Sequence, residues 1–144
     1  MNNRITNIST AEFDESTSIP GERILDISGS HLGVRIEEIP PDGTTSHHHY
    51  HTAEEEHVVV LEGDATLHLG SEQIQIGVGD HVWFPAGEPI AHHIENSSDR
   101  PFKLLVFGER KTDDVVFYPN GSVMLVKSVQ GRTTYSYSER ESDS

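Results

Sequence analysis

Apolar residues in this chain occur in short runs, separated by Gly, Pro, Asn, Asp and Ser. No run shows the 3.6-residue period of a helix, and several alternate apolar and polar residues with a period of two. This pattern predicts an all-β protein whose short strands form a jelly roll or barrel. The expected strand segments are residues 32–39, 46–51, 57–63, 65–70, 72–78, 81–87, 91–97 and 102–108.

The ends of the chain differ from this central part. Residues 1–30 are mostly polar and are expected to form an N-terminal arm or strand, and residues 31–108 the barrel. Residues 109–144 are expected to form a C-terminal hairpin and tail, because Asn-Gly at 120–121 separates two apolar runs and favours a tight turn.

One strand segment is apolar on both faces. Residues 57–61 have the sequence HVVVL, and the interior of a barrel covers only one side of a strand. The other side must pack against the N-terminal arm or a second subunit. We therefore expect a homodimer.

Composition narrows the classes of function. The 144 residues suffice for one domain, and the net charge of −14 disfavours nucleic acid and anionic membranes as partners. There is no cysteine, so a metal site must use nitrogen and oxygen ligands. The chain has no apolar run of membrane-spanning length, and its first residues lack the apolar core of a signal peptide, so a cytoplasmic location is expected.

The sequence HHHYHTAEEE at 47–56 combines imidazoles and carboxylates. Residues i and i+2 of a strand point to the same side, so His49 and His51 can share a target while Tyr50 points away. A turn through residues 52–55 then brings Glu56 alongside them. Two neutral imidazoles and a carboxylate suit a divalent metal.

A second segment downstream offers a further imidazole. A strand ends at Pro85-Ala86-Gly87, and the next strand begins near His92 and His93. Alternation places His92, Ile94 and Asn96 on one face and turns His93 to the other.

These two segments resemble the two signature motifs of the cupin superfamily. Gly43, His49, His51, Glu56 and Gly63 match the first motif in full. The second is matched by Gly79, Pro85, Gly87, His92 and Asn96, except that four residues rather than two separate Gly87 from the histidine. The segment DDVVFYPNG at 113–121 is also similar to one that follows the barrel in small bacterial cupins of unassigned activity.

The resemblance implies a cupin jelly-roll barrel with one divalent metal ion per chain, held by His49, His51, Glu56 and His92. Four protein ligands would complete a tetrahedral zinc site, whereas octahedral Fe, Mn or Ni keeps two adjacent positions open. Fe, Mn or Ni is therefore favoured, and Zn is the alternative.

The open positions predict a small oxygen-rich organic ligand and an enzyme of the dioxygenase, isomerase or lyase type. The alternatives are a non-catalytic cupin that binds a small molecule and a barrel whose metal is only structural. Catalysis would also need an acid or base, for which His47, Glu54 and Glu55 are the nearby candidates. Phe84 is expected to line the cavity, and Trp83 to be buried under the C-terminal hairpin or a partner subunit.

Overall fold

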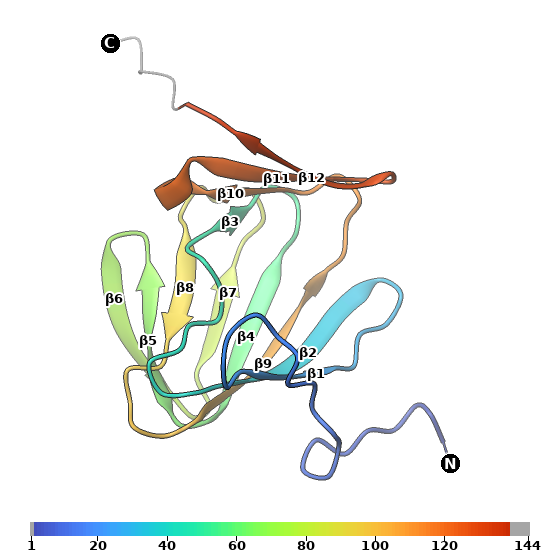
Figure 1. The fold of residues 1–144 in the computed structure, drawn as a ribbon, viewed down its shortest axis with the longest axis vertical. Helices are drawn as coiled ribbons and strands as arrows, with labels where there is room; N and C mark the ends of the chain where they lie inside the picture. The colour runs from blue at the N-terminus through green and yellow to red at the C-terminus, as the bar shows by residue number, and fades with distance from the viewer. Residues whose placement is uncertain (1, 139–144) are drawn as a thin grey trace.

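The computed structural model describes residues 2–138, and these form an all-β jelly roll (Figure 1). None of the described residues belongs to a helix long and apolar enough to cross a membrane. The elements are β1 (Arg23–Asp26), β2 (Leu32–Ile39), β3 (Tyr50–His51), β4 (Glu56–Glu62), β5 (Asp64–Leu69), β6 (Glu72–Gly77), β7 (His81–Phe84), β8 (His92–Glu95), β9 (Phe102–Glu109), β10 (Val115–Tyr118), a 3₁₀ turn (Pro119–Gly121), β11 (Val123–Ser128) and β12 (Gly131–Ser136).

Two sheets form the walls of the barrel. One has the strand order β1-β2-β9-β4-β7 and the other the order β6-β5-β8, and the strands in both are antiparallel. Their inner faces share one apolar core, to which β9 contributes Phe102, Leu104 and Val106 and β5 contributes Ala65 and Leu67. Side chains from both walls therefore pack against one another inside the barrel.

The N-terminal arm covers part of the outer face of the larger sheet. Phe13, Leu25 and Ile36 form a second apolar cluster there, and Leu61 of β4 packs against it. The strand that is apolar on both faces is thus buried on its outer side, at least in part, by its own chain. The homodimer remains a prediction.

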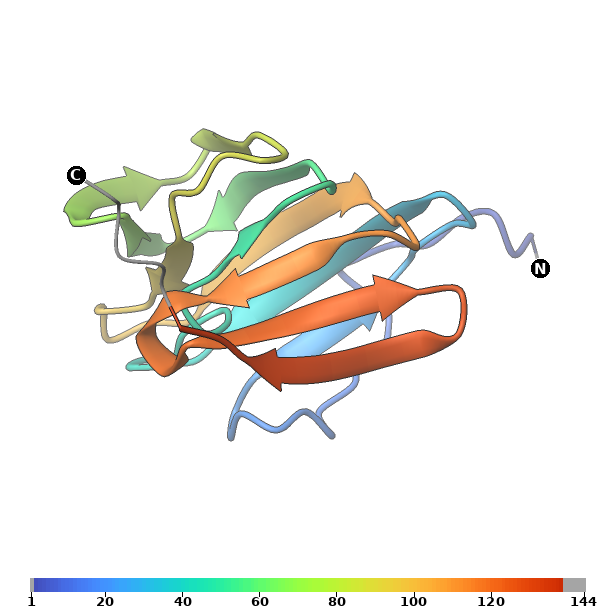
Figure 2. The same ribbon diagram turned by 90° about the horizontal axis from the view of Figure 1, so that it is seen from above.

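The C-terminal hairpin is confirmed, with β10 and β11 paired around the 3₁₀ turn. It belongs to a third sheet of order β12-β11-β10-β3, in which Val116 of β10 lies opposite His51 of β3. This sheet lies across one end of the barrel (Figures 1 and 2). It therefore brings residues from the last third of the chain to the strand that carries His51. The end of the tail, residues 139–144, lies outside the described residues.

Strand β8 shows the predicted alternation. His92, Ile94 and Asn96 are buried on the inner side, whereas His93 and Glu95 are only partly buried. Asn96 is fully buried, and its amide nitrogen donates to the backbone oxygens of Ile39 and Arg100. This asparagine joins the end of β8 to the neighbouring loops and so fixes the register that turns His92 inward.

Candidate metal centre

Backbone pairing holds His49 and His92 side by side. His49 and His92 exchange both backbone hydrogen bonds, with N···O distances of 3.2 and 2.9 Å. Their rings lie 4.6 Å apart between centroids, and the ring of His51 lies 5.1 Å from that of His49. Three imidazoles from two distant segments thus meet at one end of the barrel.

Glu56 supplies the carboxylate from the first position of β4. On the paired strand β9, Gly108 lies opposite Glu56. A Cβ atom at residue 108 would lie only 2.4 Å from the carbonyl oxygen of Glu55. A side chain at residue 108 would therefore push β4 away from β9. Glycine at this position allows the close approach that places Glu56 beside the histidines.

The side-chain atoms of these residues converge. Donor atoms of His49, His51 and Glu56 all lie within 4.8 Å of one another. His51 Nε2 is 3.9 Å and His92 Nε2 is 3.6 Å from the nearest Glu56 oxygen. His92 Nε2 is buried, and no described residue forms a hydrogen bond with it. An unpaired buried nitrogen that faces a carboxylate and two imidazoles fits the donor set of a divalent metal.

Hydrogen bonds orient the rings toward this point. His49 Nδ1 lies 2.7 Å from the backbone oxygen of His47, and His51 Nδ1 lies 2.6 Å from Asp114 Oδ2. Each Nδ1 therefore carries the proton and donates it, which leaves the Nε2 lone pair for a ligand. Metal-binding histidines commonly have such a carbonyl or carboxylate partner on the other nitrogen.

The electrostatics keep the site in its ligand-binding protonation state. Burial and the nearby His92 lower the pKa of His49 to about 4. Burial alone would raise the pKa of Glu56, but interactions with His92, His49 and His51 lower it to about 2. At neutral pH the imidazole of His49 is thus neutral and the carboxyl of Glu56 is ionised, as metal binding requires.

The lowered pKa of His49 predicts a loss of stability in acid for the metal-free protein. The unfolded imidazole titrates near pH 6.5, so between about pH 6.5 and 4 the unfolded chain binds a proton that folded His49 does not. Acidification over this range should lower the free energy of unfolding, by on the order of 2 kcal/mol. Urea unfolding in a chelator at several pH values measures the slope, and His49→Gln should flatten it. An unchanged slope in that variant would contradict the assignment.

Glu54 belongs to a separate group beside the centre. His51, Glu54 and Asp114 also lie close enough together to hold a cation. The ammonium of Lys127 already lies there, 3.0 Å from both Glu54 oxygens and 3.5 Å from Asp114. This second group therefore serves to tie β11 to the barrel through an ion pair.

The other two candidate acid–base residues lie at the periphery. His47 is exposed, and its ring meets that of Tyr118 edge-on at 6.5 Å. Glu55 lines the cavity, keeps a side-chain exposure of 42%, and lies 3.0 Å from His57 Nε2.

The centre opens into a cavity of about 680 Å³, a volume typical of small-molecule sites. His49, His51, Glu56 and His92 line it together with Phe84, which confirms that Phe84 faces inward. Trp83 is 57% exposed on β7, so the expectation that the C-terminal hairpin buries it is wrong. The hairpin pairs with β3 instead, and β7 remains at the edge of its sheet.

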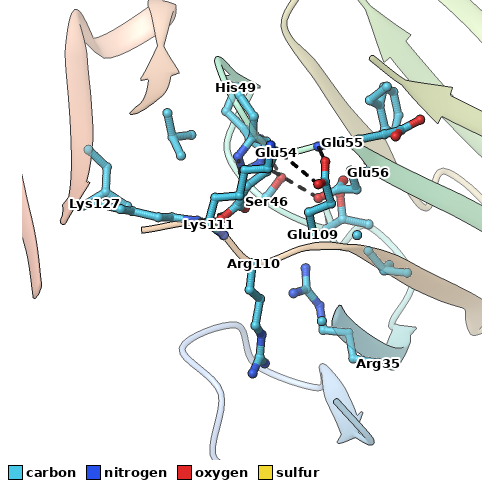
Figure 3. A pocket seen from close by; sticks show the side chains of 18 of the residues that line it. Arg35, Ser46, His49, Glu54, Glu55, Glu56, Glu109, Arg110, Lys111 and Lys127 are labelled. Atoms are coloured by element: carbon cyan, nitrogen blue, oxygen red, sulfur yellow. Dashed lines mark hydrogen bonds and ion pairs between the residues drawn. The ribbon is translucent and has the colours of Figure 1, made fainter. Parts of the chain in front are cut away.

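Several residues around the cavity come from outside the two histidine segments. The cavity is also lined by Arg35 and Glu37 of β2, Tyr118 of β10 and Lys127 of β11. Figure 3 labels Arg35 and Lys127. Asp114, which supports His51, comes from the residue just before β10. Sequence reasoning missed these residues because it sought inward-facing groups only within the two motifs.

Comparison with known proteins agrees with this architecture. A family model described as a cupin domain matches residues 35–108. A solved sugar phosphate isomerase of the cupin superfamily from Silicibacter pomeroyi superposes with a TM-score of 0.82 at 25% identity, over 90% of both chains. A protein from Acidithiobacillus ferrooxidans, provisionally described as a sugar phosphate isomerase, gives a TM-score of 0.80 at 28% identity, over 96% of this chain and 98% of its own.

A curated relative shares a shorter region. Dimethylsulfoniopropionate lyase from Ruegeria pomeroyi is 37% identical over 67 residues. The match covers 44% of this chain and 32% of the lyase, so this chain matches about a third of that protein's length.

Proposed function

Since this chain belongs to the cupin domain family, we propose that it is a metal-dependent enzyme that isomerises a small, oxygen-rich and anionic substrate. The observation that carries the proposal is the convergence of His49, His51, Glu56 and His92 on a cavity large enough for such a molecule. The two structural relatives described as sugar phosphate isomerases, one of them provisionally, support the choice of reaction.

The four residues would hold one divalent ion per chain, with Fe, Mn or Ni preferred over Zn. Three neutral imidazoles and one carboxylate leave such a centre with a net charge of about +1, which favours an anionic or enolisable ligand. When bound, the ion supplies Lewis-acid polarisation of substrate oxygens. His47, through its backbone oxygen, and Asp114 fix the orientation of two of the ligand rings.

An isomerisation also needs a group that accepts and returns a proton. Glu54 forms an ion pair with Lys127 and accepts a hydrogen bond from the backbone N–H of Lys111, and His47 is exposed beside Tyr118. We assign this role to Glu55, which lines the cavity and has a partly exposed carboxylate 3.0 Å from His57 Nε2. Burial raises the pKa of Tyr118, so its phenol stays protonated and available as a donor.

The second candidate function is a lyase. The same centre could support elimination, because polarisation of a carbonyl group acidifies the neighbouring C–H bond in both reactions. The match to dimethylsulfoniopropionate lyase favours this candidate over a dioxygenase. A non-catalytic binding protein and a barrel with a purely structural metal are the remaining alternatives.

Reconstitution of the metal-free protein tests these functions directly. Samples loaded separately with Fe(II), Mn(II), Ni(II) or Zn(II) are incubated with sugar phosphates, keto acids, diols and dimethylsulfoniopropionate. We expect turnover of a phosphorylated sugar with Fe, Mn or Ni, and its loss in Glu55→Gln with metal content unchanged. Turnover of dimethylsulfoniopropionate alone would favour the lyase. Metal-dependent stabilisation without turnover of any compound would contradict the enzyme proposal.

A further inference from the structure

Positive side chains concentrate around the cavity. The whole chain contains ten Lys and Arg residues against 24 Asp and Glu. Half of the ten line this cavity: Arg35, Arg110, Lys111, Lys127 and Arg132. Five of the 24 acidic residues line it too, so the lining has a formal charge of zero in a chain with a net charge of −14: Glu37, Glu54, Glu55, Glu56 and Glu109. Against that background, the relative enrichment of cations favours an anionic ligand.

These cations differ in their availability. Lys127 is bound to Glu54 and Asp114, and it anchors the C-terminal sheet. Arg110 and Lys111 pair with Asp26 and Glu109 at 3.8 and 3.5 Å, but all four side chains are at least 41% exposed. Water screens such surface pairs, so these pairs hold the two side chains only weakly in place. Arg35 has a similar side-chain exposure of 46%, but it projects from the inner face of β2 and its partner Glu37 is buried.

Arg35 faces the barrel interior because of its register in β2. Ile39 on the same face packs in the main core, whereas Ile36 faces the N-terminal arm on the other side. The residue opposite Arg35 on β9 is Val106, which also lines the cavity. Figure 3 shows Arg35 reaching from its strand into the pocket on the side of Glu56 and Glu109.

Glu37 holds this guanidinium at one edge only. Arg35 Nε donates to Glu37 Oε1, which leaves the two terminal nitrogens of the guanidinium for a ligand. Glu37 itself is 2% exposed and lines the cavity. Its other oxygen, Oε2, is buried with no hydrogen-bond partner in the described part of the chain. The Arg35 guanidinium is therefore the partner that compensates this buried carboxylate, and the bond in turn fixes the position of Arg35.

We propose that Arg35 binds the phosphate group of the substrate and that Glu37 positions Arg35. The planar guanidinium matches a phosphate through two parallel N–H···O bonds. The inference rests on the proposed function, since the other end of the same molecule would meet the centre formed by His49, His51, Glu56 and His92. It specifies the substrate class as a phosphate monoester with adjacent oxygen groups.

Two probes that differ only in a phosphate group test this subsite. D-glycerate carries an α-hydroxy acid that can chelate a metal, and 3-phospho-D-glycerate adds a phosphate two carbons away. Their dissociation constants are measured by calorimetry on protein loaded with Mn(II) and freed of excess metal. Wild type should bind the phosphorylated probe about tenfold more tightly or better. Arg35→Met should reduce this ratio to less than about threefold while the affinity for glycerate stays the same.

Matched variants distinguish a loss of phosphate binding from a general loss of positive charge and from a loss of thermal stability. Arg100→Met removes an exposed positive charge and should keep the full ratio. Glu37→Gln should lower the ratio although Arg35 is still present, because the guanidinium loses its ionised partner and is held less firmly. A change in thermal stability alone, with the ratio intact in both Arg35→Met and Glu37→Gln, would mean that the pair is structural.

The outcomes also distinguish this proposal from the proposed function. Equal affinity of wild type for the two probes, or a full ratio in Arg35→Met, would overturn the Arg35 subsite and leave the metal centre standing. Binding of neither probe by Mn(II)-loaded protein would contradict the proposed function as well.

Discussion

His92→Ala is expected to abolish stoichiometric binding of a divalent metal, whereas His93→Ala retains about one ion per chain. The two residues are adjacent, but β8 turns them to opposite sides. His92 is 4% exposed, with Nε2 3.6 Å from Glu56 and no hydrogen-bond partner among the described residues. His93 stacks on His68 at 4.3 Å outside the barrel, and its Nδ1 lies 2.8 Å from that of His48.

The metal content of His92→Ala and His93→Ala after dialysis against Mn(II) tests this prediction. The shift in melting temperature on metal addition is a second readout. The metal-dependent shift should vanish in His92→Ala and persist in His93→Ala. If His93→Ala loses the metal and His92→Ala keeps it, the ion binds on the outer face of β8. Loss in both variants, with both still folded by circular dichroism, would indicate that a wider histidine group is involved.

Asp114→Asn should weaken metal binding about 10- to 100-fold without removing any ligand. Asp114 is fully buried, and its oxygens lie 2.6 Å from His51 Nδ1 and 2.9 Å from the backbone nitrogen of Ala53. These contacts hold its pKa well below the ordinary value although burial opposes the shift, so it is a carboxylate at any working pH. The asparagine keeps the shape but loses the charge that raises the basicity of His51.

The neighbouring Asp113→Asn provides the control, because Asp113 is exposed and its replacement removes the same formal charge. Competition with a chromophoric chelator gives the metal dissociation constants of both variants. A similar weakening in the two would mean that general electrostatics, rather than the bond to His51, is responsible. An unchanged affinity in Asp114→Asn would contradict the role of Asp114 in orienting His51.

The parts of the fold and site that the sequence predicts are those that depend on local geometry. The period of two predicts that His49 and His51 share a side and that His92 and His93 do not, because neighbouring side chains of a strand point to opposite faces. The same rule places Phe84 inside and Trp83 outside. The Asn-Gly pair at 120–121 predicts the hairpin for an equally local reason.

Residues that meet through long-range pairing could not be predicted in this way. Asp114 reaches His51 because β10 pairs with β3, two segments separated by more than sixty residues. Arg35 and Glu37 lie in a strand that has polar and apolar residues on both faces, so alternation does not indicate which face is inside. The packing settles that question, because Ile39, on the face of Arg35 and Glu37, lies in the main core and Ile36 in the cluster under the N-terminal arm.

The central claim is that His49, His51, Glu56 and His92 bind one divalent metal ion in the cavity. The most direct test is a crystal of protein loaded with Mn(II), with anomalous diffraction recorded on either side of the manganese absorption edge. We expect one anomalous peak per chain, with the three imidazole Nε2 atoms and the Glu56 carboxylate around it at bonding distance. A peak among His51, Glu54 and Asp114 instead, or no ordered peak in the barrel, would contradict the account.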